Sequence, residues 1–249
     1  MHGVPNNKMH IYNAIKDSAL TQLAVLIDPD KHSKPSLITL ANKIEKNNVS
    51  YIFIGGSLLN SNIEEAILIL QSHTTKPIVL FPGNNLQLSN KANGILLLSL
   101  ISGRNPEYLI GNHVISAIKL KNLNIEIMPT GYILIDGGTA TSVEYMSNTR
   151  PIPANKPDII VSTAVAGELL GLRIIYLEAG SGAQNPVSCE VINQVKQNIN
   201  IPIIVGGGIN TVEKLTTVLK SKPNVIVIGN VTEKYPDKIE AFSDVITHQ

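Results

Sequence analysis

The chain has 249 residues, 43% hydrophobic and only 4% aromatic, so we expect one large core built mainly from aliphatic side chains. The formal net charge of +1 gives no indication of the clustered basic surface that is typical of nucleic-acid-binding proteins. The single cysteine, Cys189, excludes an internal disulfide framework and is interpreted as structural.

No targeting or membrane-spanning segment is visible in the sequence. Residues 1–8 are polar and lack the apolar core of a signal peptide. No apolar run approaches the ~18 residues that a spanning helix needs. We therefore expect a cytoplasmic protein. Its mildly positive mean hydropathy of +0.14 leaves room for an apolar groove or an oligomer interface.

Eight short apolar runs are typical of strands buried on both faces. They cover residues 24–28, 51–54, 78–81, 95–100, 127–135, 174–177, 203–205 and 225–228. Amphipathic patterns between and after them predict helices over 36–46, 62–71, 108–120, 157–170, 187–199, 211–219 and 236–246. An extra N-terminal helix is expected at about residues 9–20, at the bottom of the barrel.

Strict alternation of strands and helices implies a parallel sheet, and eight repeats imply closure into a (β/α)₈ TIM barrel. We expect a single domain over residues 1–249. Two intervals are irregular. Residues 83–93 leave little room for a crossover helix, so a loop or one helical turn is expected there. The interval 137–173 is long and includes a proline-rich loop at 148–153.

The last three strands each end in glycine, as Gly180-Ser181-Gly182, Gly206-Gly207-Gly208 and Gly229-Asn230. Glycine lets the backbone turn sharply and approach a ligand closely, and a helix start supplies free N–H groups to an anion. A lone triglycine is consistent with a tight turn, and Asn230 with a helix cap. Three such strand ends in succession predict a phosphate cradle at the C-terminal mouth of the barrel.

Asp28 ends the first strand and Ser57 follows the second, so both are expected at the mouth. One carboxylate and one hydroxyl form a thin protein shell for Mg²⁺, which is sufficient when phosphates complete the octahedron. The alternative is that Asp28 begins a turn and Ser57 caps the next helix. The six histidines are scattered without metal-ligand spacing, so a zinc site is not expected.

Glu178 follows a buried apolar run, where a carboxylate is costly unless it has a partner or a task. It is a candidate general base, or alternatively part of a structural ion pair with Lys31 or Arg104. Tyr176 points to the same face and either binds a substrate oxygen or fills the barrel. Arg104 is a candidate partner for a second anionic group, such as a diphosphate, or a surface salt-bridge residue.

At the strand ends the chain resembles the geranylgeranylglyceryl phosphate synthases, the prenyltransferases that make the first ether bond of archaeal-type lipids. The similarity spans nearly the whole barrel, and its most specific segment is Tyr176-Leu177-Glu178-Ala179-Gly180-Ser181-Gly182. The segments Asp28-Pro29-Asp30-Lys31 and Asn148-Thr149-Arg150-Pro151-Ile152-Pro153 look like the larger subgroup of the family, which occurs in some bacteria as well as archaea. The other matching segments are Leu26-Ile27-Asp28-Pro29-Asp30-Lys31, Ile54-Gly55-Gly56-Ser57, Phe81-Pro82-Gly83-Asn84, Ser102-Gly103-Arg104-Asn105-Pro106, Pro129-Thr130-Gly131-Tyr132, Val205-Gly206-Gly207-Gly208-Ile209 and Ile228-Gly229-Asn230.

The resemblance implies a barrel whose third helix is replaced by a loop. It implies transfer of a geranylgeranyl group from its diphosphate to the C3 hydroxyl of sn-glycerol 1-phosphate, with Mg²⁺ on Asp28 and Ser57. It assigns glycerol phosphate binding to Tyr176, Leu177, Glu178, Ala179, Gly180, Ser181, Gly182, Gly207, Gly208, Gly229 and Asn230.

Three alternatives stay open on the sequence. The donor is a longer heptaprenyl diphosphate, the chain is another phosphate-binding barrel isomerase or synthase, or it is a non-catalytic lipid- or phosphate-binding scaffold. Apolar helix residues such as Ile63, Ala66 and Ile67 are interpreted as an outer face that favours self-association. We also expect a transient contact with a membrane surface when the lipid product leaves.

Overall fold

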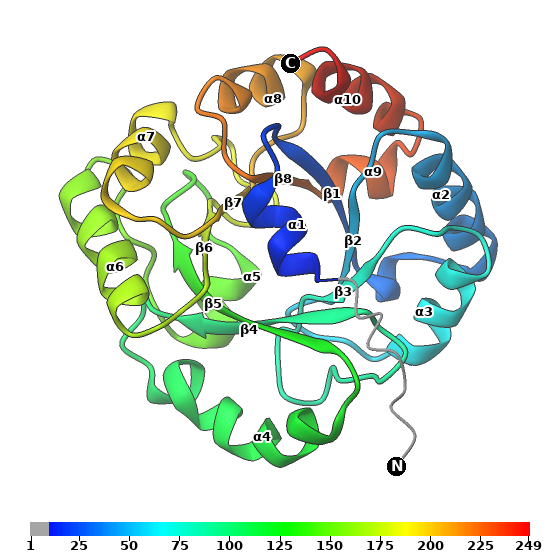
Figure 1. Ribbon diagram of the computed structural model, residues 1–249, viewed down its shortest axis with the longest axis horizontal. Coiled ribbons are helices and arrows are strands. Elements are labelled where there is room, and N and C mark those ends of the chain that lie inside the picture. The colour runs from blue at the N-terminus through cyan, green and yellow to red at the C-terminus, as the bar shows by residue number, and fades with distance from the viewer. Residues whose placement is uncertain (1–9) are drawn as a thin grey trace.

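Eight parallel strands close into a barrel in chain order in the computed structural model, which describes residues 10–249 (Figure 1). All eight predicted strands are present, and the predicted fold class is confirmed. Strands β1 and β8 pair in parallel and complete the ring, with Gln22 opposite Val225. The strands are β1 (Gln22–Ile27), β2 (Tyr51–Ile54), β3 (Ile78–Leu80), β4 (Gly94–Leu100), β5 (Glu126–Leu134), β6 (Ile174–Glu178), β7 (Ile203–Gly206) and β8 (Val225–Ile228).

Alternate strand residues divide the interior into two apolar cores. Leu177 and its equivalents pack between the sheet and the helices, where the side chains are almost all aliphatic, as expected. Tyr176 and its equivalents point to the barrel axis. There the few aromatic rings gather, with centroids of Phe53 and Phe81 6.3 Å apart and those of Phe81 and Tyr176 5.3 Å apart. The expectation of an aliphatic core therefore holds for the outer core alone.

Helices surround the barrel, and five of the ten α-helices in the described residues begin at a side-chain cap. Ser33, Ser188 and Thr211 each accept a hydrogen bond from a backbone N–H in the first turn of the following helix. The helices are α1 (Ile11–Asp17), α2 (Lys34–Lys46), α3 (Ile63–Gln71), α4 (Asn112–Asn122), α5 (Ser142–Ser147), α6 (Pro157–Leu169), α7 (Cys189–Asn198), α8 (Val212–Leu219), α9 (Asn230–Lys234) and α10 (Lys238–Thr247), with a 3₁₀ turn η1 (Pro29–Lys31) and a π-helical segment η2 (Glu107–Gly111).

Helix α1 closes the bottom of the barrel, as predicted, where Ile11, Tyr12 and Ile15 join the axial core, and it lies obliquely across the centre of the ring in Figure 1. The carboxylate of Glu126, at the start of β5, accepts hydrogen bonds from the backbone N–H groups of Ile11 and Tyr12. The Arg173 guanidinium lies 3.7 Å from the centre of the Tyr12 ring. Residue 9 of the predicted helix lies outside the described residues.

The irregular intervals leave their mark on the mouth of the barrel. Residues 83–93 form a loop without a helix, which satisfies the expectation from their shortness. The long interval contains α5, and α9 follows β8; neither short helix was predicted from the sequence. None of the helices within residues 10–249 combines the length and hydropathy of a membrane-spanning segment.

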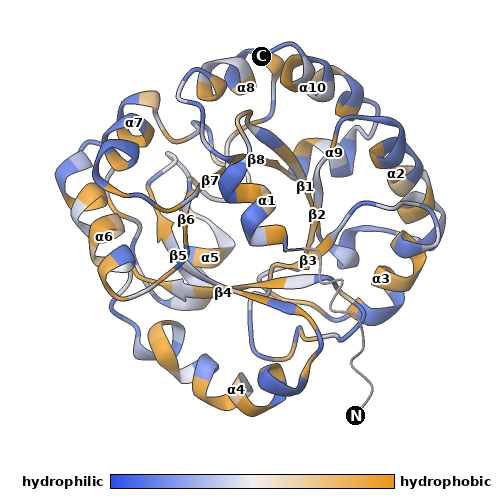
Figure 2. Cartoon of the chain, in the orientation of Figure 1, coloured by the Kyte–Doolittle hydropathy of each residue, from blue (hydrophilic) through white to orange (hydrophobic). Residues whose placement is uncertain are grey.

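Helix α4 carries its apolar residues on the outside. Ile110 of the adjoining η2 and Val114, Ile115 and Ile118 of α4 are between 59% and 74% exposed, and α4 carries conspicuous orange segments in Figure 2. Ser116 and Leu120 are its buried residues. By contrast, Ile63, Ala66 and Ile67 of α3 are buried against the barrel, so their interpretation as an outer face was wrong.

Candidate active site

A cavity of about 720 Å³ opens at the carboxyl ends of the strands. Its volume lies within the usual range for sites that bind small molecules, and its position is where barrel enzymes carry their chemistry. It brings together predicted residues from both ends of the sequence. These are Asp28, Ser57, Tyr176, Glu178, Gly180, Ser181, Gly182, Gly207, Gly208, Gly229 and Asn230.

Glu178 is the one buried carboxylate in the core of the described structure, with 6% of its surface exposed. Burial raises its pKa to about 7, although the backbone N–H of Gly180 donates to Oε1 over 2.6 Å and favours the ionised form. Neither Lys31 nor Arg104 pairs with it, so the ion-pair alternative fails for both residues. A buried carboxyl that titrates near neutral pH is suited to accept a proton.

Tyr176 lies beside Glu178 on the barrel axis. A side chain in place of Gly206 would contact both the Tyr176 hydroxyl and Glu178 Oε2, the latter at 2.7 Å, so the two oxygens border one space. The Tyr176 hydroxyl is buried and makes no hydrogen bond of normal geometry among the described residues, although it lies near enough to the Glu178 carboxylate to oppose the rise in that group's pKa. Burial, and then the neighbouring Glu178, raise the pKa of Tyr176 well above its usual value, so it stays a neutral donor.

The glycine strand ends form one continuous wall of the cavity. Gly207 has φ +82°, and a side chain there would collide with Glu178 and with the backbone N–H groups of Ala179 and Gly180. Glycine is therefore required where β7 turns away. Ser181 donates to Asn230 Oδ1 over 2.9 Å, which ties the loop after β6 to the start of α9. Asn230 is the first residue of α9 and does not cap it through its side chain.

On the opposite wall, Asp28 and the loop that carries Ser57 lie in contact. A side chain on Gly56 would come within 3.2 Å of the Asp28 carboxylate. Asp28 Oδ1 accepts from the Asp30 N–H over 3.1 Å, so Asp28 also begins a turn, as its alternative interpretation proposed. Ser57 does not cap the next helix, because Asn62 does so.

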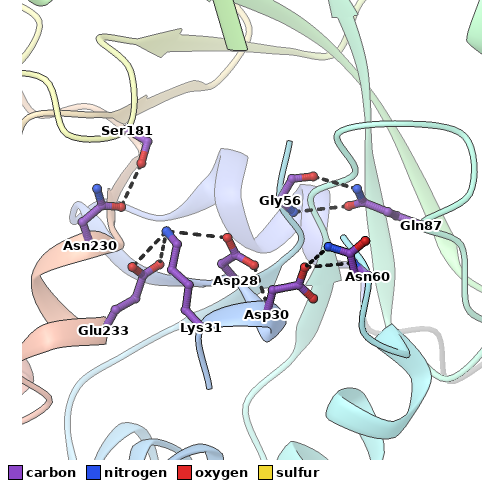
Figure 3. A network of polar contacts seen from close by, with 9 residues as sticks. All are labelled: Asp28, Asp30, Lys31, Gly56, Asn60, Gln87, Ser181, Asn230 and Glu233. Atoms are coloured by element: carbon purple, nitrogen blue, oxygen red, sulfur yellow. Dashed lines mark hydrogen bonds and ion pairs between the residues drawn. The ribbon is translucent and has the colours of Figure 1, made fainter. Parts of the chain in front are cut away.

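Gln87 holds the Ser57 loop in place and was missed in the sequence. Its side-chain Nε2 donates to the Gly56 carbonyl over 2.6 Å, and its Oε1 accepts from the N–H groups of Gly56 and Gly83 (Figure 3). Gln87 is 3% exposed. It lies in the loop between β3 and β4, which stands where a barrel helix would follow β3. No periodic pattern in this loop marks a side chain as buried.

The residues on this wall fit a hard cation that is completed by its ligand. Among residues 10–249 no group of three His, Cys, Asp or Glu side chains could hold a metal ion alone. Asp28 and Ser57 supply one carboxylate and one hydroxyl at the edge of the cavity. Mg²⁺ keeps most of its coordination for waters and substrate phosphates, so this donor set suits it.

A network of charges lies beside Asp28. The Lys31 ammonium is 3.5 Å from Asp28 Oδ2, and it also donates to both carboxylate oxygens of Glu233 over 3.1 and 3.3 Å (Figure 3). The side chain of Glu233, on α9, is 11% exposed, whereas that of Lys31 is 45% exposed. The contact joins the loop after β1 to the helix after β8.

Three predicted residues do not reach the cavity. Leu177 and Ala179 alternate with Tyr176 and Glu178 and pack into the outer core. Arg104 is not among the lining residues, and its guanidinium donates to the carbonyl groups of Gly103 and Ile101.

The cavity extends into an apolar arm beside β4. Leu97 and Ile95 face the helix side of that strand, yet both line the cavity together with Ser116 and Leu120 of α4 and Leu88 of the connecting loop. The Ser116 hydroxyl donates to the Asn112 carbonyl over 2.8 Å, so it leaves little polarity in the arm. An arm of this kind accommodates an extended apolar chain.

Comparison with known proteins places this geometry in a family. The family model described as the PcrB family matches residues 16–246. The chain belongs to this family. A geranylgeranylglyceryl phosphate synthase of Spirosoma linguale is 45% identical over 239 residues, which is 96% of each chain. The enzyme of that name from Korarchaeum cryptofilum is 35% identical over 238 residues, 95% of this chain and 98% of the relative.

A solved structure of similar fold agrees with this assignment. The (S)-3-O-geranylgeranylglyceryl phosphate synthase of Thermoplasma acidophilum, determined in complex with sn-glycerol-1-phosphate, superposes with a TM-score of 0.86. It is 31% identical, and the match covers 92% of this chain and 93% of that one. The resemblance noted at the strand ends is confirmed by these relatives.

Proposed function

We propose that this PcrB-family chain is a prenyltransferase that joins the geranylgeranyl group of its diphosphate to the C3 hydroxyl of sn-glycerol 1-phosphate. The observation that carries the proposal is the buried Glu178 beside the glycine wall, with Asp28 and Ser57 across the same cavity. The names of the relatives and the glycerol phosphate complex of the Thermoplasma enzyme support the substrate.

The acceptor phosphate lies, in this proposal, on the glycine wall formed by Gly182, Gly207, Gly208 and Gly229. The free C3 hydroxyl then reaches toward Glu178 and Tyr176. Glu178 orients the hydroxyl and accepts its proton as the ether bond forms. Tyr176 donates a hydrogen bond to a substrate oxygen, since its hydroxyl makes no hydrogen bond of normal geometry among the described residues. Placement of a weak nucleophile in this way contributes up to ~7–11 kcal/mol.

Asp28 and Ser57 hold Mg²⁺ in this proposal, with Gln87 keeping the Ser57 loop against Asp28. The ion supplies charge neutralisation for the departing diphosphate. Because the allylic carbon becomes positive as that bond breaks, the step is dissociative, and a neutral hydroxyl suffices as nucleophile once it is held in position.

The prenyl tail occupies the apolar arm between β4 and α4. Each buried CH₂ group contributes ~0.8 kcal/mol, so a long tail supplies ample binding energy. A heptaprenyl donor fits the same chemistry and differs in the length of arm that it needs. An isomerase or synthase of a sugar phosphate needs neither this arm nor a metal at Asp28, and a scaffold needs no buried Glu178.

We also propose that the protein works in the cytoplasm and associates with a second copy of itself. The supporting observation for association is the outward apolar face of η2 and α4, made of Ile110 on η2 and Val114, Ile115 and Ile118 on α4. A two-fold dimer brings the same surface patch of both copies together, so one apolar face per copy is sufficient for the contact. Transient contact with a membrane surface accompanies release of the lipid product.

The test is incubation with Mg²⁺, labelled sn-glycerol 1-phosphate and prenyl diphosphates of graded length. Labelled product extracted into organic solvent is expected, with one chain length preferred. If labelled dihydroxyacetone phosphate gives as much product as labelled sn-glycerol 1-phosphate, the choice of acceptor is contradicted. Absence of product with every donor would refute the proposal.

A further inference from the structure

The cavity contains almost no positive charge for a site that is proposed to hold two phosphate-bearing substrates. Three carboxylates line it, those of Asp28, Glu178 and Glu233. Among the described lining residues, Lys31 is the one lysine or arginine. Arg104, the cation that the sequence suggested for a diphosphate, donates to nearby carbonyl groups outside the cavity. A bound diphosphate therefore has a single ammonium to meet.

We propose that Lys31 binds the diphosphate of the prenyl donor. In the absence of the diphosphate, Glu233 pairs with the Lys31 ammonium and keeps it at the border of the cavity. This inference rests on the proposed function and adds a specificity residue to its donor side. The geometry behind it is the position of the Lys31 ammonium, 3.5 Å from Asp28 and 3.1 Å from Glu233, at the border of the cavity.

The two carboxylate partners of Lys31 differ in whether they still pair with it once a metal ion is bound. Asp28 is the candidate metal ligand, and a cation held there replaces Lys31 as its counter-charge. Glu233 remains, and the long flexible stem of a lysine lets its ammonium turn between the Glu233 carboxylate and an incoming phosphate. The Glu233 carboxylate and the phosphate compete for the same three N–H donors of Lys31. A hydrogen bond that the ammonium makes to the anion is therefore one that it no longer makes to Glu233.

A purely structural ion pair is the alternative. The Lys31 side chain is 45% exposed, and exposed pairs contribute little to stability. Nearly buried Glu233 would be an unusual choice for such a pair, since burial of its charge opposes the gain. The two explanations predict different results for Glu233→Gln. If Lys31 binds the diphosphate, neutral glutamine frees the ammonium and the affinity for an anion is kept or raised. If the pair is structural, glutamine destroys it and stability falls.

The experiment measures calorimetric affinity for inorganic pyrophosphate without magnesium, and for sn-glycerol 1-phosphate in parallel. Lys31→Met is expected to weaken pyrophosphate binding roughly tenfold to a hundredfold, because a charge-assisted hydrogen bond is lost. The affinity of Lys31→Met for sn-glycerol 1-phosphate should stay within about twofold of the wild-type value, because Lys31 is proposed to bind the diphosphate and not the acceptor. Glu233→Gln retains or raises the affinity for pyrophosphate, and Lys31→Arg restores part of it.

Lys43→Met is the matched control, because Lys43 pairs with Asp237 and does not line the cavity. It should leave both affinities unchanged. The inference is overturned if Lys31→Met binds pyrophosphate as the wild type does, if it loses glycerol phosphate instead, or if Glu233→Gln weakens pyrophosphate binding as much as Lys31→Met. Turnover of prenyl diphosphates by the wild type is measured in parallel. Product from the wild type supports the proposed function even if the inference about Lys31 is overturned, because the proposed function does not depend on the role of Lys31.

Discussion

The Glu178 carboxylate accepts a 2.6 Å hydrogen bond from the backbone N–H of Gly180. Gly180 has φ +101°, and a side chain there would collide with Thr141, so glycine is required where the carboxylate meets the glycine wall. The bond fixes Oε1, while Oε2 stays on the side of Tyr176 and the cavity. A substrate phosphate on that wall is thus placed in fixed relation to the proposed base.

Glu178→Gln should reduce kcat by roughly 10²–10⁴, because the amide keeps the shape but accepts no proton. Its oxygen can still accept from Gly180, so the wall is preserved. Affinity for sn-glycerol 1-phosphate, measured by calorimetry, should therefore change little. Turnover equal to that of the wild type would remove Glu178 from the chemistry.

The rate is expected to depend on pH through the same group. The pKa of Glu178 is raised to about 7 by burial, and the proposed base must be ionised. At limiting substrate, kcat/KM should fall about tenfold for each pH unit below that value, as for any essential base in the free enzyme. A flat profile between pH 5 and 8 would mean that no group with this pKa is required.

Stability should show the opposite trend with pH. The folded-state pKa of Glu178 is raised from 4.5 to about 7, so between these values the folded protein binds the proton more tightly than the unfolded chain. Its contribution to stability is therefore full below about pH 4.5 and is lost as the pH rises toward 7. The loss is roughly 3 kcal/mol by linkage. Chemical denaturation of the wild type and Glu178→Gln should reveal it as a growing advantage of the variant.

Tyr176→Phe tests whether the Tyr176 hydroxyl is kept for a ligand. Because this hydroxyl makes no hydrogen bond of normal geometry among residues 10–249, its removal should not lower the free energy of unfolding. Affinity for glycerol phosphate should fall about threefold to tenfold if the hydroxyl bonds to the substrate. Loss of stability without loss of affinity would assign Tyr176 a packing role alone.

Asp28→Asn tests the metal site, with Asp30→Asn as its control. Asp28 borders the cavity, whereas Asp30 accepts hydrogen bonds from Asn60 and Ser61 outside the lining (Figure 3). The pKa of Asp30 is lowered to about 2 by these bonds, so its replacement should affect the acid end of the stability profile. The magnesium concentration for half-maximal rate should rise for Asp28→Asn and stay constant for Asp30→Asn. Equal titrations for both would exclude Asp28 as a ligand.

The barrel could be predicted because its signals are local. Runs such as 203–205 are continuous apolar segments, and each is broken by glycine at the end that turns away. The same strand-end rule located Asp28, Ser57 and Glu178, since parallel strands bring their carboxyl ends to one edge.

Contacts between loops could not be predicted in this way. Gln87 and Glu233 act at the site through partners about 30 and 200 positions away along the chain, and no periodicity announces such a pairing. Helix α4 shows the other limit. Its apolar spacing correctly predicted a helix, but the same spacing would normally face a barrel, and here it faces outward. Pattern alone does not say which surface an apolar stripe will cover.

The outward face of α4 gives the last prediction. Three exposed aliphatic residues on α4, with Ile110 on the adjoining η2, cost free energy in water and are typical of an interface. Val114→Glu combined with Ile118→Glu should shift the protein toward monomer in light scattering after size-exclusion chromatography. Leu68→Glu, at a 49% exposed position on α3, is the control and should not change the mass. A wild type that is monomeric but floats with anionic vesicles, and loses that binding in the double variant, would assign the face to a membrane surface instead.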